Sequence, residues 1–246
     1  MEQRIDTIFF DIGNTLRIVV PDKEYSDAAQ KELMERVGAT VSKEAFFEML
    51  ASNYDRYREN SKKTLLDMSE MEMWMFHLLP DYPKEKIAAN AGRLTRLWRN
   101  CDGRRVPRAG VKETITELNR RGYKQGIIAN TITETEIPDW MVEDGVAEYF
   151  GAVILSSKVR LRKPDPQIYL LSCRSIGSDP GSCAYIGDNP TRDIEGTRAA
   201  GFGMMIRIDE PDTIAKEPPT AEYIPDHIIK EIPDILEIFP PLGDDR

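Results

Sequence analysis

Residues 4–19, RIDTIFFDIGNTLRIV, contain a short apolar run that ends on an acidic residue, Asp11. Isoleucine, threonine and phenylalanine are typical of a strand, and the glycine and asparagine that follow, Gly13 and Asn14, are typical of a turn. In an open parallel sheet, ligands bind outside the carboxyl ends of the strands. The stretch therefore predicts a first strand that brings the carboxylate of Asp11 to a binding edge.

From residue 105 onward, short apolar runs alternate with helical patterns. One helical pattern places Val111, Ile115 and Leu118 on a single face, with Gly122 positioned to end the helix. Strands and helices in alternation predict a parallel sheet with helices on both faces. The four runs expected as buried strands are GYKQGIIAN (122–130), FGAVILSS (150–157), SCAYIGD (182–188) and GMMIRI (203–208).

The region between these parts, residues 20–103, contains no convincing strand but has four helical patterns. Each apolar stripe is interpreted as core packing rather than as a cofactor site. We therefore expect an α/β core domain made of residues 1–19 and 104–246, and an all-helical cap domain, residues 20–103, that covers the binding edge. The helical stretches are SDAAQKELMERVG (26–38), SKEAFFEMLASNYDRY (42–57), SEMEMWMFHLLP (69–80) and PKEKIAANAGRLTRLWRN (83–100).

Composition excludes several classes of function. The net charge of -9 disfavours binding to nucleic-acid phosphates. No stretch approaches the roughly 20 apolar residues that span a bilayer, and the N-terminus lacks a signal-peptide pattern. The cysteines have no CxxC spacing and are interpreted as buried, inert thiols. We expect a cytoplasmic protein, monomer or homodimer, with no membrane or nucleic-acid partner.

A second acidic stretch is expected at the same edge of the sheet. In YIGDNPTRD (185–193), Asp188 follows a strand and Asp193 lies in the first turn of a helix. Alone, this pattern is typical of a turn and a helix cap. Together with Asp11, however, the carboxylates would repel one another unless a cation lay between them, and an all-oxygen ligand set suits Mg²⁺.

The stretch RLRKPDPQIYLL (160–171) supplies a basic residue, Lys163. A solvated loop lysine is the plain alternative, since Arg160 and Arg162 lie beside it. The prolines that follow stiffen the loop and start a helix, so the backbone of Lys163 is fixed. An ammonium group held there can neutralise an aspartate nucleophile and hold a phosphoryl oxygen.

Four motifs, in their order along the chain, resemble those of the haloacid dehalogenase superfamily of hydrolases. Residues 106–131 also resemble subfamily I, in which a helical cap lies between the first and second motifs. The resemblance implies a Rossmann-like parallel sheet with helices on both faces, an inserted all-helical cap and a Mg²⁺-dependent phosphatase acting on a small phosphorylated metabolite. The motifs are FFDIGNTL (9–16), GIIANT (126–131), KPDPQIY (163–169) and GDNPTRDIEGTRAAG (187–201).

The resemblance also implies a role for each charged residue. Asp11 is the expected nucleophile, which forms an aspartyl-phosphate with the help of Lys163. Asp188, Asp11 and the backbone carbonyl of Gly13 are the expected Mg²⁺ ligands. Asp193 is expected to support the metal, directly or through water.

Two positions depart from the phosphatase pattern. Gly13 stands where the family usually has an aspartate that acts as general acid and base, a group worth about 10² to 10⁴ in rate. Ala129 stands where a hydroxyl usually binds a phosphoryl oxygen. Asn130 and Thr131, next to it, are then expected to bind the phosphate together with Lys163.

These departures leave three readings of the function. The first is a phosphatase that takes its proton from water or from a residue of the cap. The second is a catalytically weak protein that binds a phosphorylated ligand or a partner. The third, a 2-haloacid dehalogenase, fits poorly with Asp188 and Asp193, because that chemistry needs no metal. Substrate identity is not set by the sequence.

Overall fold

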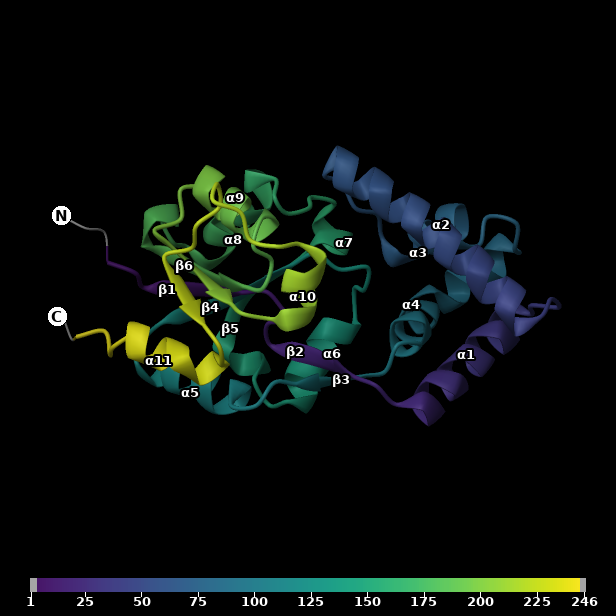
Figure 1. Ribbon diagram of the computed structural model, residues 1–246, viewed down its shortest axis with the longest axis horizontal. Helices are drawn as coiled ribbons and strands as arrows, with labels where there is room; N and C mark the ends of the chain where they lie inside the picture. Colours follow the sequence, from purple (N-terminus) through teal and green to yellow (C-terminus); the bar gives the residue numbers. More distant parts are fainter. Residues whose placement is uncertain (1–3, 244–246) are drawn as a thin grey trace.

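The strand formed by residues 7–10 lies inside a six-stranded sheet in the computed structural model, which describes residues 4–243. Neighbouring strands run parallel in the order β5-β4-β1-β6-β7-β8. Helices cover both faces of this sheet, which confirms the predicted α/β fold (Figure 1). The strands are β1 (Thr7–Phe10), β4 (Lys124–Ala129), β5 (Phe150–Leu155), β6 (Cys183–Gly187), β7 (Met204–Ile208) and β8 (His227–Ile229).

After Thr7, β1 consists of apolar residues because it is buried on both faces. Ile8 and Phe10 enter one apolar core, and Phe9 enters another on the opposite side of the sheet. Such two-sided burial gives continuous rather than alternating hydrophobicity. The first core is closed by α5 (Val111–Arg120), α6 (Glu136–Glu143) and α11 (Ile235–Ile238), and the second by α8 (Pro166–Ile176) and α9 (Arg192–Ala199).

Residues 23–100 form a helical region, called the cap below, beside the sheet (Figure 1). It has its own apolar core, in which the indole N–H of Trp74 donates to Thr95 Oγ1 at 2.8 Å. The domain limits at residues 20 and 103 stay a prediction. The helices of the cap are α1 (Lys23–Val37), α2 (Lys43–Thr64), α3 (Glu70–Glu72) and α4 (Lys84–Asn100).

The helix expected over residues 69–80 forms, but with a wider coil than an α-helix. The capping box between Ser69 and Glu72 is present and starts α3. Met73–Leu78 then continue as a π-helix, closed by the hydrogen bond from Leu79 N to Trp74 O at 3.0 Å.

Two short strands that the sequence did not reveal join the cap to the sheet. β2 (Arg17–Val20) and β3 (Arg104–Pro107) form an antiparallel pair, with Val20 opposite Arg104. Each has only four residues, two of them exposed, so neither is long enough to show a clear strand pattern.

A second attachment joins the cap to the loop that carries Lys163. The backbone N–H of Asp67 donates to Arg160 O at 3.2 Å, and that of Arg162 donates to Leu65 O at 3.1 Å. The guanidinium group of Arg162 also reaches the buried carboxylate of Asp67 at 2.9 Å. The cap is therefore attached to the core at this loop as well as through β2 and β3.

The cysteine thiols are free, as predicted, and two of them are in contact. Cys173 and Cys183 are buried with their sulfur atoms 3.6 Å apart.

Across residues 4–243, the helices are all too short or too polar to cross a membrane.

The cap core should respond sharply to loss of apolar volume. Leu33 is fully buried in it, whereas Leu66 is 52% exposed. We expect Leu33→Ala to lower the free energy of unfolding by about 2–5 kcal/mol, because buried Leu→Ala changes cost that much. Leu66→Ala should change it by less than about 0.5 kcal/mol. Urea unfolding followed by circular dichroism measures both, and equal losses would contradict this description of the core.

Candidate active site

The order of the strands creates a crevice next to β1. From β1 the chain proceeds to β4 and β5 on one side, then returns to build β6, β7 and β8 on the other. The switch point therefore lies between β1 and β6, which is where open α/β sheets bind ligands. Asp11 directly follows β1, and Asp188 directly follows β6. The backbone N–H of Asp11 donates to Ile186 O at 2.9 Å, which holds the two strand ends together.

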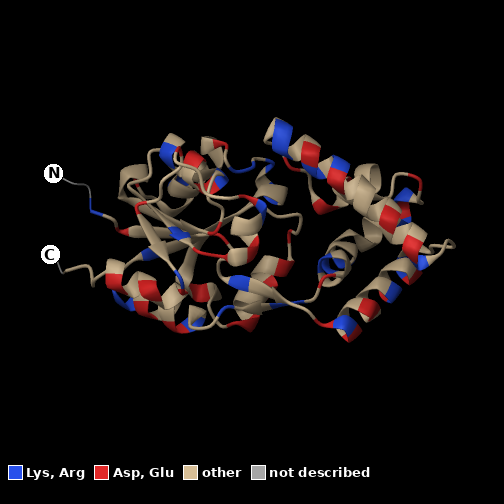
Figure 2. Ribbon diagram, viewed as in Figure 1, with Lys and Arg blue, Asp and Glu red and all other residues tan. Residues whose placement is uncertain are grey.

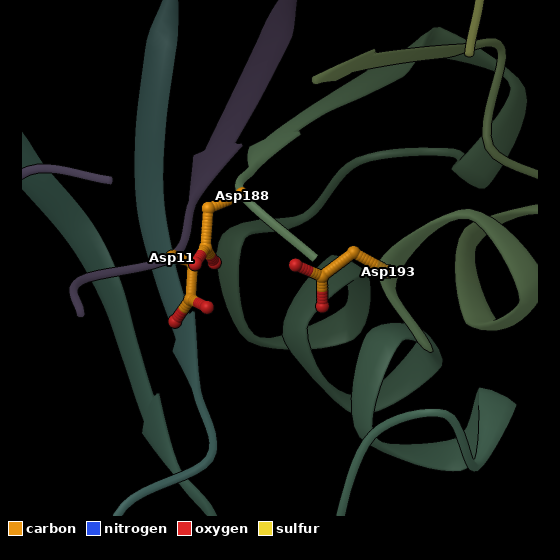
Figure 3. A group of neighbouring side chains, drawn as sticks. All are labelled: Asp11, Asp188 and Asp193. Atoms are coloured by element: carbon orange, nitrogen blue, oxygen red, sulfur yellow. The ribbon is translucent and has the colours of Figure 1, made fainter. Parts of the chain in front are cut away.

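Three buried carboxylates meet at this crevice. Oxygen atoms of Asp11, Asp188 and Asp193 all lie within 4.8 Å of one another. Figure 3 shows the first two side by side at the strand ends, with Asp193 facing them from the start of α9. Gly187 permits this approach, since a Cβ there would lie 2.4 Å from Asp193 Oδ2. The sequence prediction that these three residues gather at one edge agrees with the structure.

Lys163 is buried between two of the carboxylates. Its Nζ lies 3.0 Å from Asp11 Oδ2 and 3.1 Å from Asp193 Oδ1. It also donates to the hydroxyl of Tyr185, which itself donates to Ile128 O at 3.0 Å. An ammonium group has three donors, so all three have acceptors and its position is fixed.

Asn130 holds the backbone of Lys163. Its Nδ2 donates to Lys163 O at 3.0 Å, and its Oδ1 accepts from Lys163 N at 2.9 Å. Both groups of the Asn130 amide are therefore occupied, although the residue borders the site. This orienting role was not predicted.

A second cation, Arg192, was missed in the sequence although it directly precedes Asp193. Its Nη2 lies 3.3 Å from Asp11 Oδ2, and its Nε lies 3.1 Å from Asp193 Oδ1. The side chain of Asn189 accepts from Arg192 N at 2.7 Å and so fixes the first turn of α9. Only the acidic residues of this motif offered a recognisable ligand pattern; an arginine at a helix start carries no such signal.

The charges of the cluster do not cancel. Three carboxylates face two cations, Lys163 and Arg192, so one negative charge is in excess. Burial would raise the pKa of Asp193, but Arg192 and Lys163 outweigh it and hold that pKa below its ordinary value. Asp188 lacks such a partner, and burial together with the charge of Asp11 raises its pKa to about 6. The site is therefore poised to accept a further cation.

The donor set fits Mg²⁺. Only oxygen ligands converge here, carboxylates as the metal prefers, and no nitrogen or sulfur ligand belongs to the group found within residues 4–243. Asp188 accepts a hydrogen bond from Thr213 in α10 (Pro211–Lys216) through one oxygen. Its other oxygen can serve as a ligand.

The remaining predicted residues occupy different surroundings. Gly13 lies at the site with open space around the position of a Cβ. Ala129 is buried at the end of β4. Thr131 is buried too: its N–H donates to Ser156 Oγ at 2.9 Å and its hydroxyl accepts from Thr133 N at 3.2 Å.

The cluster opens into a cavity of about 300 Å³ under the cap. Asp11, Asp188 and Gly13 form part of its wall, together with Asn130. Most of the other charged groups are basic. The arginines that line it are Arg17, Arg58, Arg99, Arg105 and Arg192.

These features define a class of protein: a Rossmann-like α/β fold with aspartates at the switch point and a helical cap inserted after the first strand. The sequence model of the haloacid dehalogenase-like hydrolases matches residues 5–201, and the chain belongs to that family.

Its relatives include phosphatases. Glyceraldehyde 3-phosphate phosphatase of Methanothermobacter thermautotrophicus is 25% identical over 211 residues, which cover 82% of this chain and 85% of that protein. Phosphoserine phosphatase of Thermus thermophilus is 32% identical over 125 residues, covering 51% of this chain and 47% of that enzyme. The chain thus spans about half the length of this second relative.

A solved structure, the 2-haloacid dehalogenase of Pseudomonas syringae, has a TM-score of 0.68 at 20% identity, covering 95% of this chain and 97% of that one. This likeness shows the fold.

The excess charge predicts how the metal-free protein responds to Asp188→Asn. Because the pKa of Asp188 is raised from 3.8 to about 6, its proton stabilises the fold fully below about pH 4, and this contribution is lost as the pH rises through 6. At pH 8 the variant should be more stable than the wild type by about 1–3 kcal/mol, at 1.36 kcal/mol per pKa unit. At pH 4 the variant and the wild type should have the same free energy of unfolding.

Mg²⁺ should reverse that order at pH 8, because only the wild type retains the carboxylate that is expected to bind the metal. Thermal unfolding with Mg²⁺ and with EDTA measures both effects. A variant that is less stable than the wild type at pH 8 in EDTA would contradict the charge imbalance.

Proposed function

We propose that the protein is a Mg²⁺-dependent phosphatase that hydrolyses a small phosphate monoester through an aspartyl-phosphate on Asp11. The observation that carries the proposal is the buried cluster of Asp11, Asp188 and Asp193 with Lys163, which opens into an arginine-lined cavity. The phosphatases among the relatives support the same class of reaction.

The reaction proceeds in two displacements. In the first, a carboxylate oxygen of Asp11 forms a bond to phosphorus while the bond to the leaving oxygen breaks. In the second, water attacks the phosphorus, the bond to Asp11 breaks, and phosphate departs with the carboxylate restored. The strand end fixes Asp11, because its Oδ1 accepts from Ile12 N at 2.8 Å.

The fixed cations supply electrostatic stabilisation. Lys163 and Arg192 both face Asp11 Oδ2, so they offset the charge of the incoming phosphoryl group without reorganising. In this proposal Asn130 positions Lys163 through both groups of its amide, and its second Nδ2–H stays a predicted phosphate donor. Thr131 stays a predicted phosphate ligand.

Asp11, Asp188 and the carbonyl of Gly13 would hold Mg²⁺, with Asp193 in support. The bound metal would supply positive charge to the phosphoryl oxygens and offset the excess negative charge of the cluster. The chain's own residues orient the nucleophile and shield it, with Asp11 only 5% exposed.

Because Gly13 has no side chain, this position supplies no carboxylic acid to protonate the leaving oxygen. The open space at its Cβ position leaves room for water, which we propose as the proton donor. Substrates with good leaving groups are therefore expected to turn over faster than alkyl phosphates.

Phosphate release from a panel of phosphate monoesters tests the proposal. Release should depend on Mg²⁺, stop in EDTA and fall at least about 10³-fold in Asp11→Asn, because the covalent step is lost. Circular dichroism checks that the variant is folded. If no substrate yields metal-dependent release above the variant, the protein is a binding protein with little turnover. Chloride release from short 2-haloacids in EDTA would instead identify a dehalogenase.

Replacing Gly13 tests the missing acid. Because a Cβ fits without contact, Gly13→Asp should raise kcat for alkyl phosphates by about tenfold or more, the lower range of general acid catalysis. The kcat for p-nitrophenyl phosphate should stay nearly unchanged, since that leaving group needs no proton. Gly13→Asn is the matched control of equal size. An equal gain in both variants would argue against proton transfer.

A further inference from the structure

A second cavity, of about 470 Å³, lies in the cap next to the one at Asp11. The two share three wall residues, Arg58, Arg99 and Arg105. These come from α2, α4 and β3, which are separate in the chain. The shared arginines mark the passage between the carboxylate cluster and the interior of the cap.

Arg58 is the least satisfied of the three. Its guanidinium carbon lies 5.7 Å from the centre of the Tyr54 ring, and it has no ion pair with any residue of the described chain, 4–243. Two other cap arginines, Arg93 and Arg96, do form ion pairs. Arg93 pairs with Glu32 and Arg96 pairs with Asp139, both away from the cavities. Figure 2 shows acidic and basic residues mixed along α1 and α2.

The other two arginines lie close enough to repel each other. Burial, followed by the charge of Arg99, lowers the pKa of Arg105. Arg105 pairs with Asp102 through two hydrogen bonds, of 2.9 and 3.1 Å, and the side chain of that aspartate is 61% exposed. Arg99 pairs with the buried Glu136. A mobile anion placed among the three guanidinium groups would relieve this repulsion and complete the ion pairing of Arg58.

Beyond the arginines, the second cavity is walled by aromatic rings. Phe47 and Trp98 are parallel, with centroids 6.4 Å apart, and Tyr54 meets Trp98 edge-on at 5.7 Å. Ile132 and Ala51 complete an apolar wall. Such a wall favours a ring or another apolar group over a sugar or polyol chain.

We propose that the substrate is a phosphate monoester that carries a second anionic group, bound by Arg58, Arg99 and Arg105, and an apolar or ring-shaped body that occupies the aromatic part of the cap. The proposal rests on the proposed function, because it places the phosphate at Asp11. The second anion is a carboxylate or another phosphate, since a guanidinium group binds both. This surface is a specificity site, separate from the catalytic cluster.

Matched substrate pairs test it. Benzyl phosphate and 4-carboxybenzyl phosphate differ by one anionic group at equal ring size and have similar leaving groups. Ethyl phosphate and phosphoglycolate also differ by one anionic group, but neither contains a ring. Propyl phosphate and propane-1,3-diol bisphosphate test a second phosphate. We expect kcat/KM to be at least about tenfold higher for the anionic member, mainly through KM, and highest for 4-carboxybenzyl phosphate.

The decisive variant is Arg58→Gln, since Arg58 has no ion pair to lose. It should lower kcat/KM for 4-carboxybenzyl phosphate about tenfold more than for benzyl phosphate, the size expected for one charge-assisted contact. Arg56→Gln is the control: Arg56 lies in the same helix and carries the same charge, but it contacts Asn53 and borders neither cavity. An equal effect of the two substitutions would overturn the proposal.

Binding separates this inference from the proposed function. Calorimetry with benzylphosphonate and 4-carboxybenzylphosphonate, which are not hydrolysed, should give about tenfold tighter binding of the second in the wild type and not in Arg58→Gln. Metal-dependent hydrolysis of all substrates without preference would overturn the anion site and leave the phosphatase intact. Tighter binding of 4-carboxybenzylphosphonate without hydrolysis of any substrate would support the anion site and overturn the phosphatase proposal. A preference for the bisphosphate over the carboxylates would identify the second anion as phosphate.

Discussion

The ammonium group of Lys163 is the contact on which the arrangement of the site depends. Buried carboxylates at the ends of adjacent strands repel one another, and desolvation adds to the cost. Lys163 lies between Asp11 and Asp193, and its third N–H donates a hydrogen bond to the Tyr185 hydroxyl. It therefore forms ion pairs with two carboxylates that would otherwise repel each other, and it fixes their positions before any ligand binds.

The surrounding fold serves to keep that lysine in place. Asn130, at the end of β4, binds both backbone groups of Lys163, and Tyr185, within β6, accepts from its side chain. The loop before it is also hydrogen-bonded to the cap, through Arg162 and Asp67. Lys163 thus contacts the sheet and the switch point, and its loop is attached to the cap.

Sequence patterns predicted the parallel sheet and the positions of its acidic residues because both depend on local features. A strand buried on two faces is continuously apolar, and the residue after it is easy to find, as with Asp11 and Asp188. The orienting role of Asn130 and the contacts of Arg192 depend on tertiary packing, so no spacing revealed them. β2 and β3 were not predicted because each has only four residues, too few to show a strand pattern.

The site has a negatively charged part and a positively charged part. At the sheet edge the carboxylates leave one excess negative charge, whereas across the cavity Arg58 has no ion pair within residues 4–243. A divalent cation on one side and an anion with two charged ends on the other would neutralise both halves at once. Asp11 and Asp188 follow strands of the sheet and Asp193 lies in α9, whereas Arg58 and Arg99 lie in helices of the cap. In the proposed enzyme, a substitution of Arg58 would change which anion the cap holds, while Lys163 keeps its ion pairs with Asp11 and Asp193.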